Sequence, residues 1–318
     1  MSPKYYFGRC HAVFLSESGV GHDTMLDGVS WVGGFVNTTL HQLAANAAVS
    51  NDIRPWNGRG VSSWIQGIGI HSGVNSRVRF LSAPNEPIRI RTQKTEIMLV
   101  AESVIDTTLA TKLGYRGARV STVEHLLAAL YVLGHWRGFV IEVDGPEIPI
   151  LDGSALGWAL ALADLEPEAT PNPFNPYDTA VEIRGGYVGL ESFKDGEPMR
   201  ISVNVGFAHP AIGEQSWTGQ QADWLQLLDA RTFGFEREIE RLWASGRGLG
   251  AREDNAVIYN ETGPSVPTRG SDEVVRHKAL DLLGDLYLVG RPLQAHVVSE
   301  RASHEAHVAF ALELRARG

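Results

Sequence analysis

The sequence predicts an α+β fold with two domains, each a β-sheet covered by helices. Three observations support this prediction. In each half of the chain, short stretches that alternate polar and apolar residues come before apolar helical stretches. Between the halves, residues 165–180 ("LEPEATPNPFNPYDTA") contain four prolines, which remove backbone donors and disfavour helix. The length of 318 residues is enough for two domains.

The first half contains strands, then a helix, a strand and a second helix. Residues 1–60 are rich in Gly, Asn and Ser and carry one helix-like stretch, 38–49, so we leave them as an unassigned extension. Strands are expected at "SRVRFLSA", "PIRIRTQ" and "GFVIEVDG". A helix is expected over 121–134, ending at Gly134 as helices often do, and another apolar helix follows a turn within 146–165.

The second half begins again with strands, "AVEIRGGYVGL" and "MRISVNVGF". A helix is expected around 235–244, and a leucine-rich helix spans 274–290. These patterns place a first α+β domain at 61–166, a proline-rich linker at 167–180 and a second α+β domain at 181–318.

Composition excludes several classes of protein. With 28 Lys and Arg against 37 Asp and Glu, the net charge is −9, which argues against a nucleic-acid partner. A single cysteine, Cys10, excludes an intramolecular disulfide and a cysteine-rich zinc module, and it fits a reducing, cytoplasmic setting. No stretch reaches the ~18 to 20 apolar residues of a membrane span, so we expect no transmembrane segment.

The helix at 274–290 carries His277 and Asp281 four residues apart, so both side chains project from one face. One interpretation makes Asp281 a surface residue of an amphipathic helix. The other makes it buried, because leucines flank it, and a buried carboxylate needs a partner such as a metal or a histidine. Two histidines and one carboxylate form the usual open zinc site, for which His125 is a candidate third ligand.

Glu124 and His125 stand side by side at the start of the 121–134 helix. Ser121 and Glu124 have the spacing of a capping box, so Glu124 could simply cap the helix. A histidine on a leucine-rich helix is also often a core residue. If His125 binds a metal, Glu124 is placed to take a proton from water at that metal.

Three further residues are open to two interpretations. His304 and His307 are three apart and could be surface histidines, or His304 could enter the site with Asp285 holding its ring. Thr232 offers a hydroxyl before an aromatic residue, which by itself is unremarkable.

Several stretches together resemble the zinc-dependent UDP-3-O-acyl-N-acetylglucosamine deacetylases of lipid A biosynthesis. They cover roughly residues 61 to 312 in the family's order. The matching stretches are "STVEHLLAAL", "IEVDGPEIPILDGSA", "FAHPAI", "ARTFGFEREIE" and "VVRHKALDLLGDLYLVG", with looser matches at "GIGIHSG" and "GAREDNAVI".

The resemblance implies a role for each residue of interest. It implies zinc ligands at His125, His277 and Asp281. Glu124 corresponds to the general base, Thr232 to a hydroxyl that stabilises the oxyanion, and His304 to a cationic histidine oriented by Asp285. Lys278 and Phe233 correspond to substrate contacts. The family fold is a layered sandwich of two α+β domains, each with a small insert, and the second insert forms an apolar passage for the acyl chain.

The resemblance implies that the enzyme removes acetate from an acylated UDP-N-acetylglucosamine, with Zn²⁺ as cofactor. One departure from the family is Ser303, which stands where the family usually has a glycine before the histidine. The alternatives are a zinc deacetylase of another N-acyl sugar and an inactive homologue with a binding role. We expect a cytoplasmic monomer whose partner is this small-molecule substrate.

Overall fold

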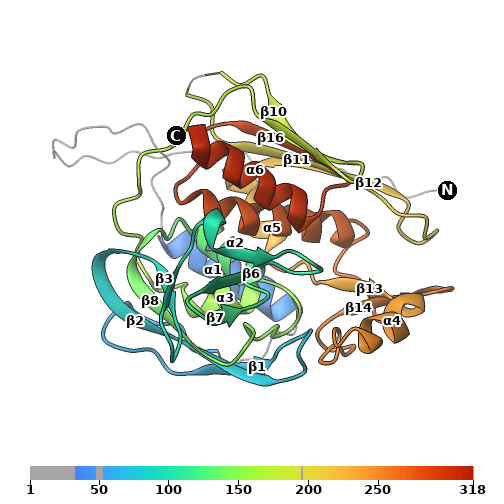
Figure 1. The fold of residues 1–318 in the computed structure, drawn as a ribbon, viewed down its shortest axis with the longest axis horizontal. Helices are drawn as coiled ribbons and strands as arrows, with labels where there is room; N and C mark the ends of the chain where they lie inside the picture. Colours follow the sequence, from blue (N-terminus) through green and yellow to red (C-terminus); the bar gives the residue numbers. More distant parts are fainter. Residues whose placement is uncertain (1–32, 48–52, 195, 318) are drawn as a thin grey trace, which may run out of the picture. The chain divides into compact units, whose positions relative to one another are not determined.

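The computed structural model of the chain describes residues 33–47, 53–194 and 196–317. Two five-stranded sheets lie on either side of a group of helices, as Figure 1 shows. This arrangement confirms the predicted α+β layered fold. Much of the extension at 1–60, including the end of its predicted helix, lies outside the described residues. The division into two domains stays a prediction.

The first sheet comes from the first half of the chain. Its long central pair, β2 and β8, is antiparallel, and β3 pairs with β8 in parallel. Val78 and Phe80 of β2 point into the core, and their polar neighbours do not, as the alternating sequence predicts. In spatial order the strands are β1 (Ile65–Ile68), β2 (Asn75–Pro87), β8 (Arg137–Asp144), β3 (Arg89–Arg91) and β4 (Glu96–Met98).

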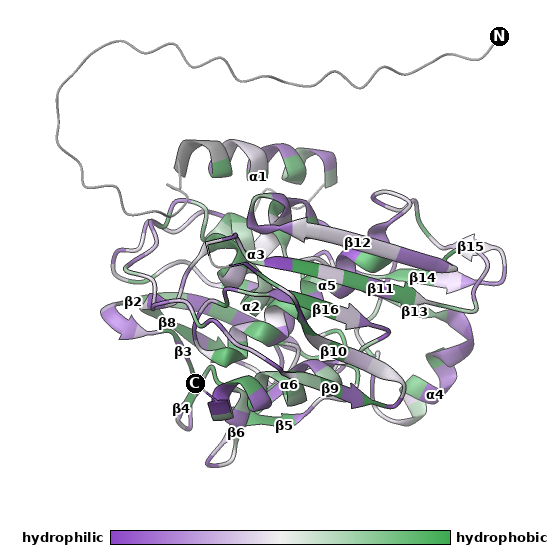
Figure 2. Ribbon diagram, turned by 90° about the horizontal axis from the view of Figure 1, so that it is seen from above, coloured by the Kyte–Doolittle hydropathy of each residue, from purple (hydrophilic) through white to green (hydrophobic). Residues whose placement is uncertain are grey.

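The second sheet comes from the second half. Its β11 and β16 are parallel, and its other pairs are antiparallel. Ile201, Val203 and Val205 of β11 are buried under the helices, and the residues between them are more exposed. Apolar and polar residues alternate along the strand, as the colours of β11 in Figure 2 show. In spatial order the strands are β12 (Glu214–Gln220), β11 (Arg200–Gly206), β16 (His296–Glu300), β10 (Gly186–Glu191) and β9 (Ala180–Ile183).

Each half also carries a small three-stranded sheet. In the first half this sheet comprises β5 (Val104–Asp106), β6 (Lys112–Tyr115) and β7 (Ala118–Val120). In the second half it comprises β13 (Phe233–Phe235), β14 (Val257–Asn260) and β15 (Gly263–Pro264), with helix α4 (Ile239–Ala244) between β13 and β14 in sequence.

The helices α2, α5 and α6 form the middle layer (Figure 1). α2 packs on α5, and α5 and α6 pack on strands of the second sheet. α2 ends at Gly134, whose φ of 74° is left-handed, as the sequence predicts. The α-helices are α1 (Gly33–Ala47), α2 (Glu124–Leu133), α3 (Leu156–Ala161), α4, α5 (Glu273–Leu286) and α6 (His304–Arg317). Short 3₁₀ turns occur at Ala101–Ser103, Gln221–Leu227, Glu236–Glu238 and Tyr287–Val289.

In the described part of the chain, no helix combines the length and the apolar character that a membrane crossing requires.

Gly284 sets the distance between α2 and α5. A Cβ atom at this position would lie 2.1 Å from the backbone oxygen of Glu124. A glycine inside a helix costs about 1 kcal/mol relative to alanine, so its presence here needs a reason. The reason is the close approach of α5 to the first turn of α2, which brings the histidines and carboxylates of the two helices together.

Candidate metal centre and active site

Three buried side chains from α2 and α5 meet at one point. Nε2 of His125 lies 3.9 Å from Oδ1 of Asp281, and Nε2 of His277 lies 3.6 Å from the same oxygen. One potential ligand atom from each residue lies within 4.8 Å of the other two. The helical spacing of His277 and Asp281 and the close packing at Gly284 together produce this convergence.

The three residues fit a metal ion. Burial lowers the pKa of His125 to about 3 and lowers that of His277, so both imidazoles are neutral. Nδ1 of His277 lies 3.3 Å from the carbonyl oxygen of Ala230, and a proton donated there leaves the Nε2 lone pair facing Asp281. Two neutral imidazoles and a carboxylate at one buried point are the donor set of an open zinc site.

Lys278 keeps one oxygen of Asp281 occupied. Its Nζ donates to Oδ2 of Asp281 at 2.7 Å, while Oδ1 faces the two histidines. Burial alone would raise the pKa of Asp281, but the neighbouring His277 and Lys278 outweigh burial and hold it below its ordinary value. The carboxylate therefore stays ionised and presents Oδ1 to the metal position.

Glu124 lines the same cavity as the three residues and does not cap its helix. The residue at the N-cap of α2 is Val123, and no side-chain capping bond forms there. Ser121 instead pairs with Glu147 through a β-bridge. The Glu124 side chain accepts a hydrogen bond from the backbone N–H of Thr111 at 3.0 Å, and burial raises its pKa to about 8. The capping-box interpretation is thus wrong for Glu124.

His304 and His307 share the carboxylate of Asp285. Their Nδ1 atoms lie 2.8 and 3.0 Å from Oδ2 of Asp285. Both rings are buried, so the interpretation as surface histidines is wrong. Burial alone would lower the pKa of His304, but Asp285 and Asp281 outweigh burial and raise it to about 9. Burial lowers the pKa of His307, which stays neutral.

Only the first of these two histidines reaches the site cavity. His304 lines it, and its Nε2 lies 3.9 Å from Oδ2 of Asp281. His307 does not line the cavity, and its Nε2 lies 3.3 Å from the hydroxyl of Ser299 in the core. This geometry supports His304 as the residue that faces a substrate.

The cavity has a volume of about 440 Å³ and a largely apolar lining on one side. Thr232 and Phe233 line it at the start of β13, and the Phe233 ring meets the His277 ring edge to face at 6.0 Å between centroids. Further apolar side chains come from the small sheet and α4 of the second half: Phe235, Ile239, Leu242, Trp243 and Ile258.

Three buried residues around the site were not found from the sequence. Thr111 bonds both Glu124 and Asp285. Thr122, just before α2, has a left-handed φ of 58°, which is unusual for a β-branched residue. Its hydroxyl donates to Glu147 at 2.7 Å, and Glu147 also accepts the backbone N–H groups of His71 and Ser72. "GIGIHSG" and "PEIPI", which the family resemblance includes, were the only sequence signals for this arrangement.

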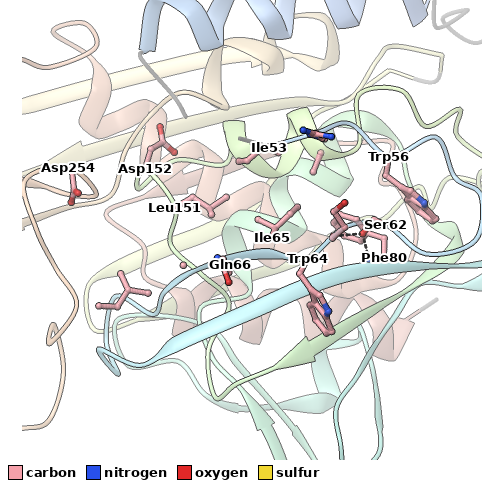
Figure 3. Close-up of a pocket in the computed structure, with 15 residues that line it drawn as sticks. Ile53, Trp56, Ser62, Trp64, Ile65, Gln66, Phe80, Leu151, Asp152 and Asp254 are labelled. Carbon is pink, nitrogen blue, oxygen red and sulfur yellow. Dashed lines mark hydrogen bonds between the residues drawn. The ribbon is translucent and has the colours of Figure 1, made fainter. Parts of the chain in front are cut away.

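A larger cavity of about 710 Å³ lies elsewhere, beside β1 and α3. Trp56, Trp64, Asp152 and Asp254 line it, as Figure 3 shows. The backbone N–H of Phe80 donates to the Ser62 hydroxyl in its wall. None of the residues predicted for the site lines this cavity, so we do not assign the active site to it despite its larger volume.

Comparison with known proteins identifies a family whose model matches most of the chain. The family model "UDP-3-O-acyl N-acetylglycosamine deacetylase" matches residues 61–316, a segment that contains every predicted site residue. A UDP-3-O-acyl-N-acetylglucosamine deacetylase of Myxococcus xanthus (strain DK1622) is 37% identical over 252 residues, covering 76% of this chain and 80% of the relative. The protein of the same name from Syntrophus aciditrophicus (strain SB) is 38% identical over 255 residues, covering 76% and 79%. That from Synechocystis sp. (strain ATCC 27184 / PCC 6803 / Kazusa) is 36% identical over 274 residues, covering 79% and 95%.

Proposed function

The chain belongs to the UDP-3-O-acyl N-acetylglycosamine deacetylase family, and from this premise we propose how its own residues perform the reaction. It is a zinc-dependent amidohydrolase that removes the N-acetyl group of UDP-3-O-acyl-N-acetylglucosamine as acetate, a step of lipid A biosynthesis. Within the proposal, His125, His277 and Asp281 hold the zinc. The observation that carries this assignment is the convergence of one potential ligand atom from each of the three residues at one buried point.

Bound zinc would lower the pKa of a water molecule and polarise the amide carbonyl. Glu124, next to His125 in the first turn of α2, accepts the proton that this water loses as its oxygen bonds to the carbonyl carbon. The positive charge of bound zinc would lower the raised pKa of Glu124 and so favour the ionised carboxylate that this role requires. The backbone N–H of Thr111 fixes one Glu124 oxygen at 3.0 Å, so the carboxylate keeps a constant orientation. The Thr232 hydroxyl, on the cavity wall, donates to the oxyanion that develops on the carbonyl oxygen.

His304 supplies positive charge and a proton on the opposite side of the reacting amide. Asp285 holds its Nδ1, and its Nε2 lies 3.9 Å from Oδ2 of Asp281 in the cavity-lining ring. We assign to Nε2–H the protonation of the nitrogen as the C–N bond breaks, because an amine is a poor leaving group unless it is protonated. Acetate and the free amine are then the products. Glu124, holding the proton taken from water, is the other donor within the site.

Lys278 and Phe233 contact the substrate in this proposal. The apolar wall formed by β13, β14 and α4 receives the 3-O-acyl chain, since a hydrocarbon chain gains free energy by leaving water. We also propose that the chain folds as two domains, 61–166 and 181–318, joined by the linker 167–180. We further propose that the enzyme acts in the cytoplasm as a monomer, which sedimentation would test.

The experiment that tests the function measures acetate release from UDP-3-O-acyl-N-acetylglucosamine, with and without a zinc chelator. We expect release that the chelator abolishes and added Zn²⁺ restores. A second arm uses UDP-N-acetylglucosamine without the acyl chain and should release far less acetate. Equal acetate release from both sugars would favour the alternative that the protein deacetylates another N-acyl sugar. Release from neither sugar would favour the alternative that it is an inactive homologue with a binding role.

A further inference from the structure

Thr111 links the two carboxylates of the active site. It lies immediately before β6, in the small sheet of the first half, and its side chain is fully buried. Its backbone N–H donates to Oε2 of Glu124 at 3.0 Å, and its hydroxyl donates to Oδ1 of Asp285 at 2.6 Å. One residue thus contacts both the proposed base on α2 and the carboxylate on α5 that holds His304.

The distances favour one arrangement of the hydrogen bonds around Asp285. A threonine hydroxyl has one proton to donate. Oγ1 of Thr111 lies 2.6 Å from Oδ1 of Asp285 but 3.4 Å from Nδ1 of His304. Nδ1 of His304 lies closer, at 2.8 Å, to Oδ2 of Asp285. The hydroxyl proton therefore goes to Asp285, and His304 gives its Nδ1 proton to the other oxygen of the same carboxylate.

The two oxygens of Asp285 differ in the number of donors they have. Oδ2 accepts from both His304 and His307. For Oδ1, the hydroxyl of Thr111 is the one side-chain donor recorded in the described part of the chain. Loss of this hydroxyl would leave Oδ1 without a donor in a fully buried place, which is costly for a carboxylate. The carboxylate would turn, and the His304 ring bonded to it would turn with it.

We propose that Thr111 is a positioning residue for the deacetylation, an inference that rests on the proposed function. Its hydroxyl fixes the plane of the Asp285 carboxylate and thereby the direction of His304 Nε2 into the cavity. Its backbone N–H fixes Glu124 on the water side. The loop before β6 thus fixes the orientation of the base, Glu124, relative to that of the acid, His304, although the two come from helices far apart in the sequence.

The test is the variant Thr111→Val, which removes the hydroxyl and keeps both the shape and the backbone N–H. We expect kcat to fall about 10- to 100-fold, the range that corresponds to one hydrogen bond to a buried charge. KM and zinc content should stay at the wild-type values, because neither zinc ligands nor substrate contacts change. Thr111→Ser, which keeps the hydroxyl, should restore most of kcat.

A matched control is Thr179→Val. Thr179 is also buried and its hydroxyl donates to the backbone oxygen of Tyr177, away from the site, so kcat should not change. A general loss of stability would affect both variants, and thermal unfolding measures it. If Thr111→Val does not fold, Thr111→Ala removes the same hydroxyl with less steric demand and should show the same fall in kcat.

A double-mutant cycle with Asp285→Asn decides whether Thr111 acts through Asp285. We expect the Thr111→Val loss to shrink to about twofold or less when Asp285 is already Asn. An undiminished loss in that background, or wild-type kcat in Thr111→Val, overturns the inference while wild-type deacetylation stands. Absence of acetate release from the wild-type enzyme would instead overturn the proposed function and this inference with it.

Discussion

Replacing Gly284 with alanine should pull the proposed zinc ligands apart. The added Cβ would lie 2.1 Å from the Glu124 carbonyl oxygen, about 1.3 Å short of an ordinary contact of 3.4 Å. The obstructing atom is backbone, so α2 and α5 must separate. His125 Nε2 already lies 3.9 Å from Asp281 Oδ1. A separation of about 1 Å would take that pair beyond the reach of one zinc ion, whose bonds to N and O are only about 2.0 to 2.2 Å long.

The expected result of Gly284→Ala is a large loss of zinc affinity, measured by competition with a coloured chelator. Overpacking should also cost about 1 to 3 kcal/mol of unfolding free energy, partly offset by the better helix propensity of alanine, about 1 kcal/mol. The matched control is Gly157→Ala in α3, where the nearest atoms to the added Cβ belong to the Leu151 and Ile53 side chains rather than to the backbone. Wild-type zinc affinity and kcat in Gly284→Ala would refute the reasoning.

Three other predictions concern single residues. Glu124→Ala should keep its zinc by metal analysis and lose about 10²- to 10⁴-fold in kcat, the usual worth of a general base, so unchanged acetate release would contradict its role. His304→Ala should lower kcat more than His307→Ala, since of these two histidines only His304 lines the cavity. A larger loss in His307→Ala would instead assign the catalytic role to His307. Burial alone would raise the pKa of Glu147, but hydrogen bonds outweigh burial and hold it below 4.5. The stability that Glu147 contributes is therefore complete above pH 4.5 and lost as the pH falls through the lowered value. Urea unfolding across this range should show a weaker pH dependence for Glu147→Gln, and equal dependence would contradict this.

The sequence was enough to predict the strands β2, β3, β8, β9, β10 and β11, the helix that ends at Gly134, and the pairing of His277 with Asp281. Each depends on contacts between residues near one another in the chain, or on a repeat of two or four residues. The same local information was ambiguous for Glu124. Ser121 has the spacing of a capping partner, but its backbone pairs with Glu147, so tertiary structure overrides the local pattern.

Contacts between segments far apart in the chain could not be predicted from the sequence. Thr111 lies 174 positions from Asp285, and no spacing rule relates the two. The three-residue step between His304 and His307 did not reveal that both rings share one carboxylate, because that depends on how α6 lies against α5. Gly284 likewise gains its meaning only from the backbone of α2, which lies against it.

We infer that His125, His277 and Asp281 hold the zinc on which acetate release depends. Zinc content and acetate release, measured on the same samples of the wild-type enzyme and of His277→Ala, test this inference directly. We predict one tightly held zinc ion per wild-type chain, with activity in proportion to occupancy, and neither zinc nor activity in the variant. Full zinc occupancy in His277→Ala, or acetate release that does not follow zinc content, would contradict the claim.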